Sequence, residues 1–264
     1  MKGGAVRKFV SIIIIIVLVA PFFLPDPNEM DMSSILSPPE SEHLFGTDSL
    51  GRDMLSRLAS GSRNSVVIAG SVTVLSLLLG LLGGTVSLTS KVADEVIMRT
   101  MDALRALPAI LPASLMMVSL KGGLWTLVIV LTTVFVPQCA RLVRSEGRKQ
   151  LSSGYHEAAI VTGLRQPRAM IRLVIRHAIP LLRAHVPFIF SSACILESTL
   201  SFIGAGVGAS PPTLGQMISE GRGVFLTHPR IVLLPLAALI FFTLCFSLQW
   251  KELRPDRGII DEKS

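Results

Sequence analysis

The sequence has 264 residues, of which 50% are hydrophobic and only 16% are charged, and its mean hydropathy is +0.61. This composition excludes an ordinary soluble domain, in which about 25% of the residues are charged. A helix needs about 20 apolar residues to cross a hydrocarbon core of roughly 30 Å, so about six spans fit in the chain. The apolar stretches are continuous rather than alternating, which favours helices over a barrel. The sequence therefore predicts an all-α, polytopic membrane protein.

The net charge of +7 and the cysteines do not indicate a nucleic-acid or metal site in this protein. In a membrane chain, positive charge more often orients the protein than binds nucleic acid, so no nucleic-acid partner is expected. Cys139, Cys194 and Cys245 stand singly in or beside apolar stretches, without the spacing of a metal site. We expect them to be packing residues, and we expect no metal site and no catalytic residue in this chain.

The first apolar run covers residues 9–24 and follows three basic residues. It ends between two prolines without the small-residue site that signal peptidase needs, which favours an uncleaved first span over a cleaved signal sequence. Five further spans are predicted, at residues 66–88, 103–120, 124–140, 179–203 and 231–250. The span at residues 103–120 is the weakest, because Pro108 and Pro112 interrupt it.

These spans divide the chain into three parts. Residues 1–65 are predicted to form an N-terminal anchor helix and an extracytoplasmic segment, residues 66–250 the transmembrane core, and residues 251–264 a cytoplasmic tail. Placing both termini in the cytoplasm puts nineteen of the 25 Lys and Arg residues inside, as the distribution of basic residues in membrane proteins favours. Membrane lipid is the expected surrounding, and residues 141–178 form the largest cytoplasmic loop.

Two stretches expected outside the cytoplasm and one in the basic cytoplasmic loop have sequence patterns that predict local structure. Gly46 and Gly51 indicate turns before a short amphipathic helix that begins near Asp53. A glycine- and proline-rich turn over residues 204–212 precedes a short helical pattern. In the basic loop, residues 152–163 combine a serine N-cap, an early acid, two alanines and a final glycine. That pattern predicts a short helix whose small-residue face another surface can approach closely.

The residues of this loop resemble a known family. Glu157-Ala158-Ala159 with Gly163, followed by residues 176–180, resemble the EAA loop of bacterial ABC importer permeases. The order of three further motifs, which begin at Phe45, Asp94 and Leu200, is similar to that of the dipeptide/oligopeptide/nickel permease family. The resemblance covers about residues 43–256. The sequence departs from the family pattern in the distance from Gly163 to Pro180, which is about four residues longer than usual.

The resemblance implies the transmembrane domain of a type I ABC importer. It implies two cytoplasmic ABC ATPases, a second, homologous permease and an extracytoplasmic binding protein as partners. Glu157, Ala158, Ala159 and Gly163 would contact an ATPase, although Glu157 could instead form an ion pair within its own loop. The substrate would be a small peptide, or nickel or another metal chelate. The chain itself would be no enzyme and hold no cofactor, because ATP and Mg would bind the partner subunits.

One charge and one rival function stay open. Glu197 lies about 18 residues into the fifth span, where an ionisable group is costly and defaults to a functional role. A hydrogen bond between two helices and a contact in the translocation path both remain possible roles for it. The rival function is a channel or membrane scaffold that docks cytoplasmic proteins through its basic loop. A membrane-embedded enzyme fits worst, because the sequence contains no HExxH and no GxSxG motif.

Overall fold

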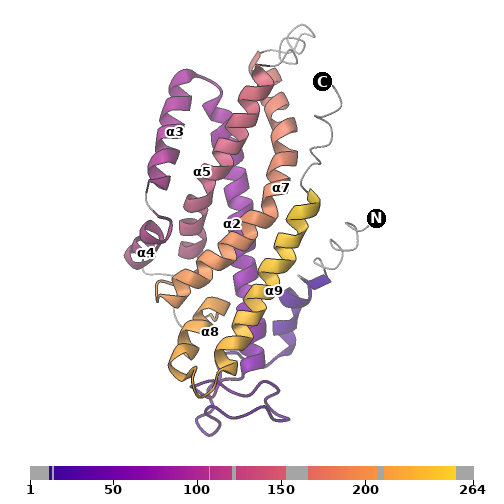
Figure 1. The fold of residues 1–264 in the computed structure, drawn as a ribbon, viewed down its shortest axis with the longest axis vertical. Helices are drawn as coiled ribbons and strands as arrows, with labels where there is room; N and C mark the ends of the chain where they lie inside the picture. Colours follow the sequence, from indigo (N-terminus) through magenta and orange to yellow (C-terminus); the bar gives the residue numbers. More distant parts are fainter. Residues whose placement is uncertain are drawn as a thin grey trace.

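The computed structural model describes residues 12–13, 15–106, 108–120, 123–152, 166–206 and 211–253, without the side chains of residues 166–170 and 248–253. Regular structure in this part of the chain is helical, apart from an isolated β-bridge between Thr47 and Asp53. The elements in chain order (Figure 1) are η1 (Ala20–Phe23), α2 (Met54–Ser87), α3 (Lys91–Arg105), α4 (Ile110–Ser119), α5 (Leu124–Leu151), α7 (Gln166–Phe202), α8 (Leu214–Gly221), η2 (Arg222–Val224) and α9 (Arg230–Leu253). The prediction of an all-α fold is confirmed.

Four helices among the described residues are long and apolar enough to cross a membrane. They are α2, α5, the Ile171–Phe202 part of α7 and the Arg230–Ser247 part of α9. Helices α3 and α4 together make a fifth candidate, bent by 89° close to Pro108, where the sequence predicted an interrupted span. The predicted first span, residues 9–24, lies only partly within the described residues, so a total of six spans stays a prediction.

Helix α2 is longer than the sequence indicated. The amphipathic helix expected from Asp53 and the second span at 66–88 form one continuous helix of 34 residues, about 51 Å long at 1.5 Å per residue. The helix begins where the Asp53 side chain accepts a hydrogen bond from the Ser56 amide at 2.8 Å. The two turns before it are confirmed, because Gly46 and Gly51 have φ angles of 71° and 72°.

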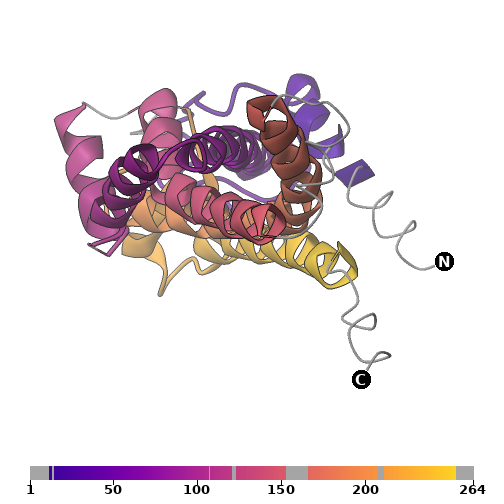
Figure 2. The same ribbon diagram turned by 90° about the horizontal axis from the view of Figure 1, so that it is seen from above.

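Small residues bring α2 against α5. A Cβ atom at Gly80 would lie 2.2 Å from Cys139 Cβ, and one at Gly84 would lie 2.6 Å from the Ala140 carbonyl oxygen. The GxxxG pattern of α2 therefore packs against a helix of the same chain. Helix α7 contacts α2, α5 and α9 and completes the bundle. Seen from above, α3 and α4 lie at one edge of this bundle (Figure 2).

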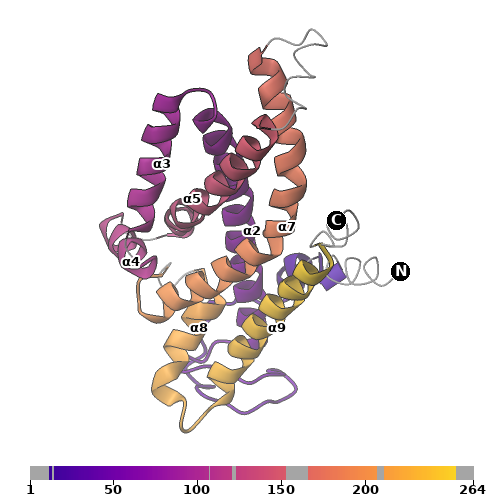
Figure 3. The same cartoon turned by 45° about the horizontal axis from the view of Figure 1, so that its top comes forward.

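The two ends of the bundle differ. At one end, α8 packs against α7 and α9, and the segment that precedes α2 lies beside it (Figure 3). We call this the α8 end. At the opposite end, α5 finishes at Leu151 and α7 begins at Gln166. We call this the arm end, because both helices project there beyond most of the bundle (Figure 1).

The close approach of α2 and α5 generates a prediction. Gly84→Ala should lower the free energy of unfolding by about 1–3 kcal/mol, because the new methyl group forces the two helices apart. Thermal unfolding of the purified chain in detergent measures the effect. Gly83→Ala is the matched control, since its Cβ would meet nothing closer than 3.9 Å. Equal unfolding temperatures for the two variants would contradict this packing.

Candidate functional site

The four residues predicted to contact an ATPase fall outside the described residues. Glu157, Ala158, Ala159 and Gly163 belong to residues 153–165, which we call the EAA segment. The structure does place the helices that lead into and out of this segment. Helix covers the first and last parts of the loop expected at residues 141–178, because α5 continues to Leu151 and α7 begins at Gln166.

Tight packing fixes the two helices next to the EAA segment. A Cβ at Gly147 of α5 would lie 2.2 Å from Leu88 Cδ1 and 3.3 Å from Val174 Cγ2 of α7. Val143 and Val174 are completely buried at the same place. Interiors packed at this density transmit a displacement instead of absorbing it. A displacement of the last turns of α5 would therefore be passed to α7.

Glu197 is completely buried in α7, at 0% exposure. The Ser65 hydroxyl of α2 donates a hydrogen bond to its Oε2 atom at 3.1 Å. Within α7, Ser198 donates to Oε2 at 3.2 Å and Ser201 donates to Oε1 at 3.0 Å. The carboxyl group thus joins two long helices, and the hydroxyl groups offset the cost of burying it.

The same contact region extends to the loop before α8. The Ser65 hydroxyl also accepts a hydrogen bond from the Leu214 amide at 3.2 Å, and the Asn64 side chain donates to the Pro212 carbonyl at 2.8 Å. Gly215 lies so near α7 that a Cβ would be 2.4 Å from Ser198 Cα. Glu197 and Ser65 therefore lie at the centre of the junction between α2, α7 and α8.

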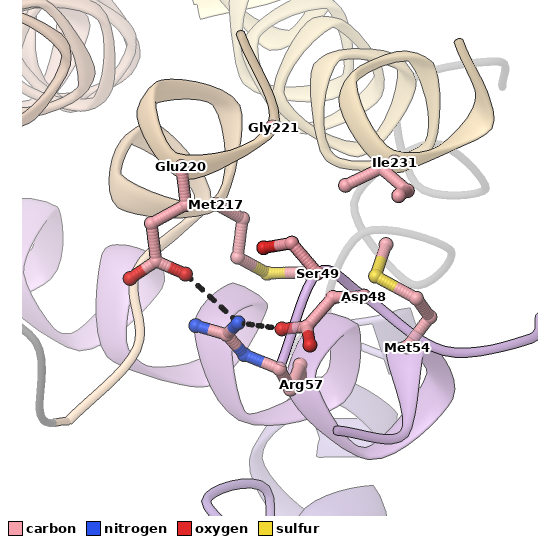
Figure 4. A pocket seen from close by; sticks show the side chains of 8 residues that line it. All are labelled: Asp48, Ser49, Met54, Arg57, Met217, Glu220, Gly221 and Ile231. Atoms are coloured by element: carbon pink, nitrogen blue, oxygen red, sulfur yellow. Dashed lines mark hydrogen bonds and ion pairs between the residues drawn. The ribbon is translucent and has the colours of Figure 1, made fainter. Parts of the chain in front are cut away.

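A buried ionic cluster at the α8 end was not assigned a role from the sequence. It consists of Asp48, Arg52, Arg57 and Glu220 (Figure 4 shows three of them). Arg52 donates from Nε to Asp48 and from Nη2 to Glu220, both at 2.7 Å. Arg57 contacts Asp48 and also lies 2.8 Å from Glu220. The two arginines thereby fasten the segment before α2 to α8.

The electrostatics of Asp48 follow from its surroundings. Burial raises the pKa of the Asp48 carboxyl, but the backbone amides of Arg52 and Leu50 and the charges of Arg57 and Arg52 outweigh it and lower the pKa below 3.8. Removing one partner of such a buried pair strands the other charge and costs about 3–5 kcal/mol. The cluster therefore depends on all of its members.

The sequence contained only part of the signal for these sites. Glu197 was noticed because a charge stood inside an apolar span, and Ser201 stood four residues further on, at helical spacing. Ser65 could not be found, since it lies 132 residues away along the chain. For the same reason Glu220 could not be joined to Arg52, from which 168 residues separate it.

The fold is similar to that of solved membrane transporters. A solved structure of an amino acid ABC transporter with histidines superposes with a TM-score of 0.59 at 18% sequence identity. The match covers 75% of this chain and 92% of that chain. At this identity the likeness concerns the fold alone, and it confirms the predicted transmembrane domain of a type I ABC importer.

Sequence comparison defines the family. Residues 76–251 match the family described as binding-protein-dependent transport system inner membrane component. The di/tripeptide transport system permease protein DppC of Pseudomonas aeruginosa is 33% identical over 254 residues, 93% of this chain and 84% of that protein. The oligopeptide transport system permease protein OppC of Bacillus subtilis is 31% identical over 230 residues, 85% and 75% of the two chains. The chain therefore belongs to this family of permease subunits.

The lowered pKa of Asp48 generates a prediction. Its stabilising effect should be complete above pH 3.8 and be lost as the pH falls through the lower pKa of the folded protein. Asp48→Asn should therefore lower the free energy of unfolding at pH 7 by about 3 kcal/mol and reduce its acid dependence. Thermal unfolding between pH 7 and pH 3 measures both effects.

Asp31→Asn is the control for this experiment. Asp31 is exposed, and hydrogen bonds from the Ser33 and Ser34 side chains lower its pKa to about 2. Its replacement should change stability at pH 7 much less, because Asp31 is exposed and the hydrogen bonds that its side chain makes to described residues lie within its own turn. A larger loss for Asp31→Asn than for Asp48→Asn would contradict the importance of the cluster.

Proposed function

We propose that this chain is the permease subunit of an ATP-driven importer for small peptides. The observation that carries the proposal is the identity of 31–33% to permeases named for di/tripeptide and oligopeptide transport, over most of both chains. These names favour a peptide over nickel or another metal chelate. Membership of a family of binding-protein-dependent transport components argues against the channel and scaffold alternatives.

The proposed complex contains two ATPase subunits and two permeases. Two cytoplasmic ABC ATPases would bind ATP and Mg, and a second, homologous permease would complete the path through the membrane. An extracytoplasmic binding protein would deliver the peptide. The α8 end would face this protein and the arm end the cytoplasm, with both termini of the chain inside. The positive-inside distribution of basic residues supports this orientation.

Coupling would occur at the EAA segment. Glu157, Ala158, Ala159 and Gly163 would form a short helix that docks on an ATPase, and ATP-driven closure of the two ATPases would move it. The close packing of Gly147 of α5 against Val174 of α7 supports this mechanism, because these two helices lead into and out of the EAA segment. The docking contacts can drive transport only if their free energy differs between the inward- and outward-open states.

The proposal predicts the behaviour of Glu157→Lys. ATP-driven uptake into proteoliposomes should fall at least tenfold, because the reversed charge weakens docking of the EAA segment. Uptake is measured with a mixture of di- to pentapeptides, and in parallel with a nickel–histidine chelate. The proteoliposomes contain both permeases, the ATPases and the binding protein. Glu95→Lys is a matched control, since Glu95 is exposed on α3 and pairs only with Arg99 among the interactions resolved.

The possible results separate the claims. Loss of peptide uptake in Glu157→Lys alone, with normal membrane insertion, supports docking through the EAA segment. Unchanged uptake in this variant would refute that docking. Uptake of the chelate without any peptide would refute the substrate class, and absence of ATP-driven uptake of either probe by the wild-type complex would refute the importer itself.

For Glu197, we propose a role as a contact between helices rather than a residue of the translocation path. Its complete burial and its bond to Ser65 support this role. Glu197→Ala should then destabilise the chain by about 2–4 kcal/mol, because it leaves a cavity and buried hydroxyl groups without their acceptor. Glu197→Gln should be milder, since the serine hydroxyls can rotate to donate or accept. Wild-type unfolding temperatures combined with lost uptake in both variants would instead place Glu197 in the path.

A further inference from the structure

Helix α3 contains one of the motifs by which the sequence resembles its family. This motif belongs neither to the EAA segment nor to the sites around Glu197 and Asp48. The motif runs from Asp94 to Arg99, in the first half of α3. The Ser90 hydroxyl caps the helix by accepting a hydrogen bond from the Ala93 amide at 3.1 Å. Asp94 therefore lies in the first turn, where the helix dipole favours a negative charge.

Apolar packing holds α3 weakly to the rest of the chain. Met98 is its one buried residue, whereas Val92 and Val96 are exposed. Helix α4 follows α3 after a break and a bend of 89°, and these two helices lie at the edge of the bundle seen in Figure 2. A helix with so little buried apolar surface needs other contacts to keep its position.

Ion pairs supply those contacts, and among the described residues the pairs that α3 makes with another helix go to α5. Arg144 binds both carboxylate oxygens of Asp94, with 2.6 Å between Nη2 and Oδ2. Arg148 donates to the same Oδ2 atom at 2.6 Å, and Arg141 pairs with Asp102, about two helical turns further along α3. The Asp94 side chain is only 16% exposed and that of Arg144 26%, so the bidentate pair is partly shielded from solvent.

The three arginines lie on the part of α5 that leads into the EAA segment. Their spacing of three and four residues places them on one face of the helix. Gly147 and Val143 lie between them in the sequence and are buried against α2 and α7. The last turns of α5 therefore contact α3 through ion pairs, and α7 and the end of α2 through close packing.

We propose that Asp94 is a positioning residue for transport, which makes α3 and α4 follow the movement of the last turns of α5. This inference rests on the proposed coupling through the EAA segment. A displacement of α5 carries Arg144 and Arg148 with it, and the carboxylate they share draws α3 along. Without that carboxylate, the last turns of α5 move but the bent α3–α4 span keeps its position. ATP hydrolysis then continues, but the path for the substrate does not open.

Asp94→Asn in the reconstituted complex tests the inference. Uptake of the di- to pentapeptide mixture should fall at least tenfold, whereas the ATPase rate stays within twofold of wild type and both ATPases still copurify with the permease. Glu95→Gln, one position along the same helix, should leave both rates unchanged because its pair with Arg99 is exposed. Asp94→Glu keeps the charge and should retain more than half of the uptake.

Several results would overturn the inference. Normal uptake in Asp94→Asn would show that α3 does not need the ion pair, and failure of this variant to copurify with the ATPases would show a role in assembly instead. A parallel fall of uptake and ATPase rate would mean that the carboxylate acts before coupling. The proposed function fails separately, if the wild-type complex shows no ATP-driven uptake or if Glu157→Lys transports normally.

Discussion

The structure depends on one constraint, which is that hydrocarbon offers no hydrogen-bond partners. The chain meets it with long helices that satisfy their own backbones and with polar side chains gathered at a few places. Glu197 and its serines form one such place, and the Asp48 cluster closes the α8 end. Further along α2, towards the arm end, the helices meet through glycines, because lipid tails give apolar side chains little reason to associate.

This arrangement makes the chain stiff in one part and loosely held in another. Helices α2, α5 and α7 interlock through Gly80, Gly84 and Gly147, so they respond to a force together. Helices α3 and α4 bury few residues, and α3 is held to α5 by ion pairs. A transport subunit needs both properties, since it must carry movement from its motor over a long distance and also change the shape of a path.

Local patterns in the sequence were sufficient to predict the class of protein, its family and most of its helices. Continuous apolar runs defined the spans, and the prolines near residue 108 marked the bend between α3 and α4. The length of α2 was missed because its first three turns contain many polar residues, which packing against α8 and the ionic cluster accommodates. The partners of Glu197 and Arg57 come from distant helices, and periodicity along one helix contains no record of such contacts. The EAA segment rests on its motif alone, since residues 153–165 lie outside the described structure.

The central claim is that the EAA segment faces the cytoplasm and is covered by an ATPase. Ala158→Cys tests it most directly, through labelling with a membrane-impermeant maleimide. The background should be low, because Cys139 and Cys194 are buried and Cys245 is half-buried. The account predicts labelling in inside-out vesicles, protection when the ATPases are added, and no labelling from the opposite side. Labelling from the outer side, or equal labelling with and without the ATPases, would contradict it.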